Sequence, residues 1–117
     1  MSKSSKQIIG SFVFRNEGDG CLTSKYHHRD SSEGPFTEAC KLLRQESTDT
    51  LFLGTYQTVW LEDNNNHVAA ILDISPHQNN QLFKLIWREA AKNGIIYFEG
   101  TGMLFDNFLT GAYWSPL

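Results

Sequence analysis

Hydrophobic residues in this chain recur mostly at every second position, in short runs that turn-forming residues separate. A period of two predicts β-strands, because successive side chains of a strand point to opposite faces. Turn chemistry at 16–20 and at 106–107 marks two hairpins, and such short connections require antiparallel neighbours. The predicted strands cover 8–15, 21–28, 50–62, 67–74, 82–89, 94–105 and 108–114.

One segment, 36–46, departs from this alternation and fits helical spacing instead. The positions i, i+3, i+4 and i+7 of one helix face are taken by Phe36, Ala39, Cys40 and Leu43. Pro35 suits the first turn of such a helix, and Glu38 falls on the opposite face. We therefore predict one short α-helix over 36–46, with Glu38 in water.

The last third of the chain, 82–114, contains three consecutive predicted strands that are dense in aromatic residues. A meander of this kind in 117 residues indicates a closed or nearly closed barrel. The predicted fold class is all-β: a single domain over 1–117 that forms a small antiparallel up-and-down, calycin-like barrel of seven to eight strands. We expect residues 1–6 to form a flexible tail.

The strand expected around 95–104 is apolar on both faces. A sheet with one face in water would alternate cleanly between apolar and polar residues. The second face must then be covered by the helix or by another subunit, so we expect a homo-oligomer. Gly100 and Gly102 inside this strand are expected to permit either a sharp bend or close packing of an aromatic residue from the next strand.

Composition limits the classes of partner. A net charge of −3 gives no reason to expect nucleic acid as a partner. No apolar run approaches the roughly 18 residues of a membrane-spanning helix, and no signal peptide is visible, so we expect a cytoplasmic protein without a membrane partner. Cys21 and Cys40 are expected to remain thiols there. The adjacent His27 and His28 would point to opposite faces of a strand, so no metal site is predicted.

Short motifs over most of the chain resemble those of the calycin barrels, and of the avidins more than the lipocalins. The segments IGS at 9–11, DGCLT at 19–23 and Tyr26 resemble an avidin's opening hairpin, and FLGTYQT at 52–58 resembles a Phe-x-Gly-Thr-Tyr-x-Thr strand of that family. Trp87-Arg88, Phe98-Glu99-Gly100 and Trp114 are similar to its late strands. The resemblance implies a ligand-enclosing barrel. The resemblance does not imply biotin binding. In avidins an aspartate on the eighth strand contacts the ureido group of biotin, and we expect no counterpart of that strand after Trp114.

The leading functional prediction is a non-enzymatic protein that binds a small, partly apolar ligand. Cavities in small barrels are mainly apolar with a few polar groups, and aromatic rings with a hydroxyl or indole N–H can stack and orient a flat ligand. Tyr56 and Trp60 share one strand face, and Trp87 could oppose them from another strand. The predicted ligand-binding residues are Ser11, Tyr26, Tyr56, Trp60, Trp87 and Trp114. No catalytic residue, metal or cofactor is predicted.

Two alternatives stay open. The aromatic residues could fill a solid barrel whose exposed aromatic face is a subunit interface. The barrel could also be a small isomerase or cyclase that uses Tyr56 or Glu99, which requires a carboxylate or histidine inside the cavity within reach of a hydroxyl. Glu99 and Asp73 both fall inside apolar strands, where a buried carboxylate would need a partner, with Arg15, Lys84 and Arg88 as the candidates. An outward-facing Glu99 is the ordinary interpretation.

Overall fold

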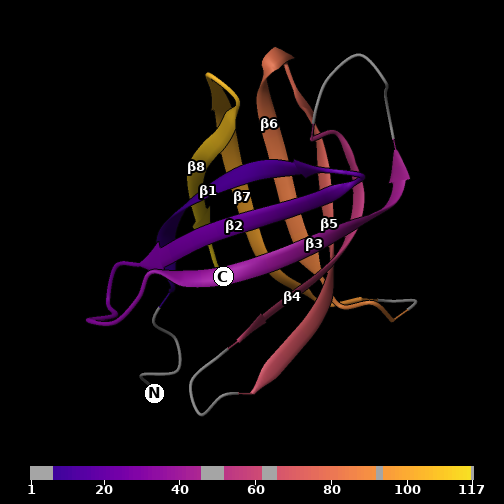
Figure 1. The fold of residues 1–117 in the computed structure, drawn as a ribbon. Coiled ribbons are helices and arrows are strands. Elements are labelled where there is room, and N and C mark those ends of the chain that lie inside the picture. The colour runs from indigo at the N-terminus through magenta and orange to yellow at the C-terminus, as the bar shows by residue number, and fades with distance from the viewer. Residues whose placement is uncertain (1–6, 46–51, 62–65, 92–93, 117) are drawn as a thin grey trace.

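In the computed structural model, the chain forms a closed antiparallel β-barrel (Figure 1). The structure describes residues 7–45, 52–61, 66–91 and 94–116. Within these residues the strands are β1 (Ile9–Gly18), β2 (Cys21–His28), β3 (Phe36–Gln45), β4 (Gly54–Leu61), β5 (His67–His77), β6 (Asn79–Arg88), β7 (Ile96–Phe105) and β8 (Phe108–Trp114). The predicted tail at 1–6, the end of the predicted helix at 46, and positions 50, 51 and 62 of the predicted strand over 50–62 lie outside the described residues.

Each strand pairs with its neighbours in sequence, and β8 pairs back onto β1. Figure 1 shows β1, β2 and β3 crossing in front of β6 and β7, as two walls of one barrel do. Closure leaves no strand with unpaired backbone groups along its edge. The predicted all-β up-and-down barrel is confirmed, and so is the turn at 106–107, because Phe105 pairs directly with Phe108.

The predicted helix over 36–46 is wrong, because Phe36–Gln45 is strand β3, paired with β2 and β4. Its inward positions are Phe36, Glu38, Cys40 and Leu42, and the residues between them face outward. A glutamate at an inward position interrupts the apolar alternation, so the chance spacing of Ala39 and Leu43 looked helical. Glu38, expected in water, is only 3% exposed.

Because 36–45 is a strand, β8 is already the eighth strand and closes the barrel. Gly10 of β1 pairs with Tyr113 of β8, and Ile9 pairs with Trp114. No further strand after Trp114 is needed for closure.

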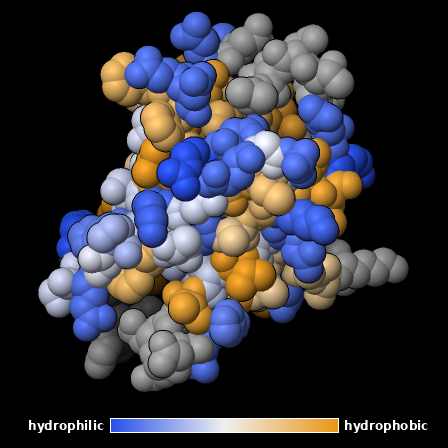
Figure 2. Space-filling model, in the orientation of Figure 1, coloured by the Kyte–Doolittle hydropathy of each residue, from blue (hydrophilic) through white to orange (hydrophobic). Residues whose placement is uncertain are grey.

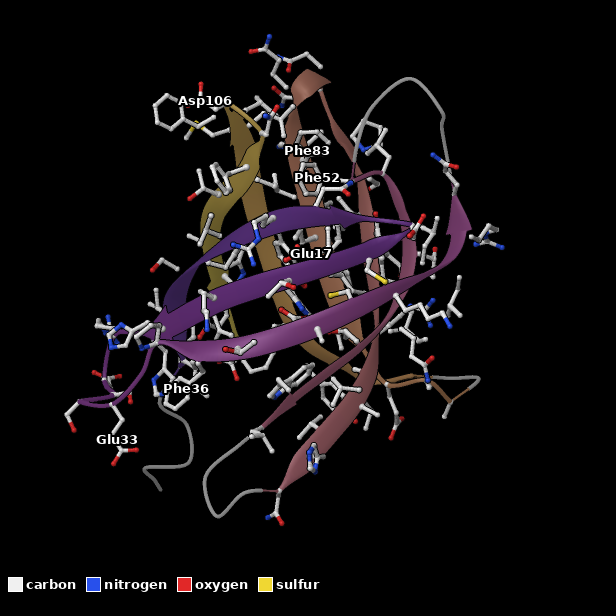
Figure 3. The ribbon with its side chains drawn as sticks, viewed as in Figure 1. Glu17, Glu33, Phe36, Phe52, Phe83 and Asp106 are labelled. Carbon is white, nitrogen blue, oxygen red and sulfur yellow. The ribbon has the colours of Figure 1, made fainter. Side chains whose placement is uncertain are left out.

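The barrel interior is packed solid at one end, which we call the closed end. Figure 3 shows Phe52 and Phe83 together there, near the turn that carries Asp106, while Phe36 lies toward the opposite end. Full burial of one large apolar side chain contributes about 1.5–3 kcal/mol to the free energy of unfolding, so the side chains at the closed end supply much of the stability of the barrel. The closed end is filled by Phe14, Leu22, Phe52, Leu72, Ile74, Phe83, Leu85 and Leu109, each at most 3% exposed.

Glycines on the inner face of β7 let large rings approach the strand closely. A Cβ atom on Gly100 would lie 3.1 Å from Cζ3 of Trp87 and 2.8 Å from the carbonyl oxygen of Ala112. One on Gly102 would lie 3.3 Å from Cζ of Phe12. Of the two expected roles, close packing of aromatic residues is observed, but the rings come from β6 and β1 rather than from the next strand, β8.

The outer face of the barrel is mixed in character. Figure 2 shows polar and apolar side chains intermingled on the face in view. On the outside of β5 and β6, Arg88 Nε lies 2.6 Å from Asp73 Oδ2, so Arg88 is the one of the three candidate partners that pairs with Asp73. Glu99 lies between the inward-facing Phe98 and Gly100 and pairs with Trp114, so it faces outward.

Candidate functional site

The other end of the barrel, which we call the open end, contains a cavity of about 480 Å³. Its rim includes Ile8, His28, Phe36, Leu61 and Asn66, all at or next to strand ends on the same side of the barrel. The volume falls within the range of about 300–1,000 Å³ that is typical of small-molecule sites. The remaining lining residues are Phe12, Tyr26, Glu38, Trp60, Trp87, Phe98 and Tyr113.

The aromatic lining residues hold one another in place through ring contacts. Phe98 meets Tyr113 edge to face, with ring centroids 5.5 Å apart, and meets Trp60 at 6.3 Å. Trp87 contacts Tyr113 at 6.1 Å and Phe12 at 5.9 Å. Such contacts are individually favourable and restrict ring rotation, so the wall is preformed rather than assembled on binding.

Glu38 places a carboxyl group on the wall of this apolar cavity. The Thr58 hydroxyl donates a hydrogen bond to Glu38 Oε2, and the indole N–H of Trp87 donates to the same oxygen at 2.8 Å. Thr58 is on the neighbouring strand β4, whereas Trp87 is on β6. The carboxyl group is therefore fixed from two elements, and Trp87 belongs both to the aromatic wall and to the polar group.

Two further polar side chains surround Glu38. Ser24 is its cross-strand neighbour on β2, and the thiol of Cys40 donates to Thr58 Oγ1 at 3.4 Å. The Ser24 hydroxyl is close enough to Glu38 to lower the pKa of that carboxyl group. It nevertheless has no partner of normal hydrogen-bond geometry among the described residues, although it is fully buried. This polar cluster lies between the cavity and the packed closed end.

The electrostatic state of Glu38 follows from its surroundings. Burial raises the pKa of Glu38, and this outweighs the hydrogen bonds from Thr58 and Trp87 and the proximity of the Ser24 hydroxyl and the Cys40 thiol, which lower it. Within the described ranges no lysine, arginine or histidine forms an ion pair with it. Burial, followed by the Glu38 carboxylate, raises the pKa of Tyr113 to about 12.

Three of the six predicted ligand-binding residues line the cavity: Tyr26, Trp60 and Trp87. Tyr56 faces inward as expected but lies nearer the closed end, where its hydroxyl donates to the backbone carbonyl of Phe52 at 2.9 Å. It is not among the lining residues.

The other two predicted residues face away from the cavity. Ser11 is exposed and alternates with the inward-facing Phe12. Trp114 lies one position beyond the inward-facing Tyr113 and pairs with Ile9 and Glu99 on the outside. Binding of a ligand by Tyr26, Trp60 and Trp87 stays a prediction.

The sequence interpretation missed Glu38, Phe12, Phe98 and Tyr113. The signal for Glu38 was present, because Phe36, Cys40 and Leu42 alternate around it in the manner of a strand. Phe98 and Tyr113 lie in strands that were predicted correctly, but both faces of those strands carry large side chains, so the pattern did not identify the inner face.

Comparison of the chain with protein-family models, with curated proteins and with solved structures found no match. Among the residues that the structure describes, no group of three or more His, Cys, Asp or Glu side chains is placed to hold a metal ion. The same part of the chain contains no helix long and apolar enough to cross a membrane.

Proposed function

We propose that this protein is a non-enzymatic binding protein whose barrel encloses a small, partly apolar ligand at its open end. The observation that carries the proposal is the cavity of about 480 Å³, walled by aromatic rings around one buried carboxyl group. A barrel that served only as a structural element would be expected to fill this volume with its own side chains, as the closed end does.

The division of the barrel into two ends supports this proposal. The closed end is packed without need of a ligand, so the open end can remain hollow at an acceptable loss of stability. A ligand that buries about 200 Å² of apolar surface gains about 5 kcal/mol from that burial. Association costs a similar amount in lost motional freedom. Useful affinity therefore depends on the preformed wall and on a polar contact such as Glu38.

A small isomerase or cyclase is the second candidate, because Glu38 brings a carboxyl group into the cavity within reach of the Thr58 hydroxyl. Acid–base catalysis needs groups that exchange protons near the working pH. Tyr113, the phenol that the carboxylate influences, has a pKa of about 12 and is a poor proton donor or acceptor at neutral pH. Glu38 already accepts two hydrogen bonds on one oxygen. These features favour binding over catalysis.

Titration with 1-aminoanthracene, a neutral flat fluorophore, tests the proposed function. We expect saturable binding with energy transfer from tryptophan. Trp60→Ala should weaken the affinity about tenfold, because it removes one cavity wall. Trp114→Ala is the matched control and should bind as the wild type does, since this ring lies outside the barrel. No binding to folded wild-type protein, or equal weakening in both variants, would contradict the proposal; circular dichroism establishes that each variant is folded.

A further inference from the structure

Glu38 retains hydrogen-bonding capacity that the described residues do not use. The hydrogen bonds that it accepts from Thr58 and Trp87 both end on Oε2. Among the described residues none donates a hydrogen bond to Oε1, and the fully buried hydroxyl of Ser24 lies close enough to the carboxyl group to lower its pKa without forming a hydrogen bond of normal geometry. Buried polar groups are nearly always paired, so an unsatisfied cluster next to a cavity indicates that a polar atom of a ligand completes it.

An ionised Glu38 would have no counter-ion among the residues that the structure describes. The titratable groups packed around Glu38 are Cys40 on β3 and Tyr113 on β8, and those nearer the rim are Tyr26 and His28 on β2. None of these forms an ion pair with the carboxyl group, and the described residues that line the cavity include no lysine or arginine. Within the described part of the chain, the hydrogen bonds that an ionised Glu38 accepts come from neutral donors, Thr58 and Trp87.

The walls add to the preference for positive charge. Aromatic faces carry negative electrostatic potential, and they attract ammonium groups within about 6 Å. Trp60, Trp87 and Tyr113 all contribute rings to the same cavity as Glu38. The carboxyl group and the rings disfavour an anionic ligand, and together they favour a cation.

We propose that the ligand is a small organic amine, protonated on nitrogen and attached to a flat apolar body, whose N–H group donates to Glu38 while the body packs against the aromatic wall. The inference rests on the proposed function, since it assigns the chemical class of ligand to the same cavity. The ammonium group supplies the positive charge that the cavity lacks. A protonated Glu38 gives up its proton to the buffer as the ammonium ion binds, so the complex contains one carboxylate and one ammonium group.

The test compares three probes with the same indole ring and different termini: tryptamine, indole-3-ethanol and indole-3-acetate. In calorimetric titration of the wild type, tryptamine should bind about tenfold or more tightly than indole-3-ethanol, because charge-assisted hydrogen bonds are stronger than neutral hydrogen bonds by an amount that corresponds to about this factor in affinity. Indole-3-acetate should bind most weakly. Glu38→Gln should remove most of the tryptamine preference. Glu99→Gln is the matched control, because it removes a carboxylate from the outer face, and it should behave as the wild type does. Titrations in two buffers of different ionisation enthalpy report the released proton.

The possible outcomes separate the two proposals. If 1-aminoanthracene binds but tryptamine does not displace it, or if the three indoles bind equally, the amine inference is overturned and the proposed function stands. If the tryptamine preference survives in Glu38→Gln, the carboxyl group is not its origin and the inference is also overturned. If neither the fluorophore nor any indole binds folded protein, the proposed function itself fails. Glu38→Asp provides a second variant, which keeps the charge and should retain part of the preference.

Discussion

The replacement Glu38→Gln should stabilise the empty barrel, and it should do so increasingly as the pH rises. The amide is nearly isosteric with the carboxyl group, so its carbonyl oxygen can accept from Thr58 and Trp87 as Oε2 does. Its amino group can donate to Ser24, whose hydroxyl has no partner of normal geometry among the described residues. At a pH where Glu38 is protonated, we therefore expect the free energies of unfolding of variant and wild type to agree within about 1 kcal/mol.

The pH dependence follows from the raised pKa of Glu38. Burial raises this pKa in the folded state above its usual value of about 4.5, so between the two values the folded protein binds more protons than the unfolded chain. The contribution of Glu38 to stability is fully present below the unfolded pKa and is lost as the pH rises through the folded pKa. For every pH unit that separates the folded from the unfolded pKa, ionisation costs the wild type about 1.4 kcal/mol of stability, and Glu38→Gln avoids this cost.

Urea denaturation followed by far-ultraviolet circular dichroism, between pH 4 and pH 9, measures the effect. The stability of Glu38→Gln minus that of the wild type should rise across this range and then level off. Other titrating groups are common to both proteins and cancel in the difference. Glu99→Gln, on the outer face, should show no comparable rise. A flat difference, or one that turns against Glu38→Gln at high pH, would refute the claim that Glu38 is a buried acid without a counter-ion.

Three further predictions concern the polar cluster, the barrel wall and the outer face. Thr58→Val should lower stability by about 1–3 kcal/mol in urea denaturation, because Glu38 loses a hydrogen-bond donor; an unchanged midpoint would contradict this. Gly100→Ala should lower the free energy of unfolding by about 1–3 kcal/mol in the same assay, since the new methyl group would lie too close to the Trp87 ring and to the backbone carbonyl oxygen of Ala112. An unchanged free energy of unfolding would contradict the close packing at this position. We also propose a homo-oligomer whose interface buries Phe105, a side chain that is 71% exposed in the single chain. Light scattering should then give a molar mass above that of the monomer, and Phe105→Ser should lower this mass. A monomeric wild type would contradict the proposal.

Strand positions could be predicted where the sequence alternates and local turn chemistry fixes the ends. The hairpin from β7 to β8 is an example, because a two-residue turn at 106–107 forces Phe105 opposite Phe108. Strand β3 also alternates at Phe36, Cys40 and Leu42, but its pattern fitted a helix as well, so the same rule did not decide between the two. Its inward set includes Glu38, which no burial pattern anticipates, and its outward set includes the apolar Ala39 and Leu43. The hydrophobic pattern of this segment led to the wrong prediction of a helix, because contacts with other strands, rather than the polarity of each side chain, decide which face of a strand is buried.

The candidate site could be predicted only in part, because alternation gives the face of a residue but not its depth in the barrel. Tyr56 and Trp60 share the inner face of β4, yet Tyr56 lies toward the packed closed end and Trp60 lines the cavity. That difference depends on the stagger between strands, which pairings with distant segments determine. Ser11 and Trp114 failed for a simpler reason, since their neighbours Phe12 and Tyr113 occupy the inward positions.

Glu38 made strand β3 hard to recognise in the sequence, and Glu38 also places the carboxyl group in the cavity. Both observations have one cause. A sequence selected only for barrel stability would place an apolar side chain at position 38, since the neighbouring inward positions are largely apolar. Local rules are expected to be broken where function requires it, and stability is then recovered elsewhere. Here the closed end, with Phe14, Leu72 and Leu85 wholly buried, provides that recovery. If Glu38→Gln proves more stable and loses its preference for amines, the carboxyl group is retained at a cost that only ligand recognition explains.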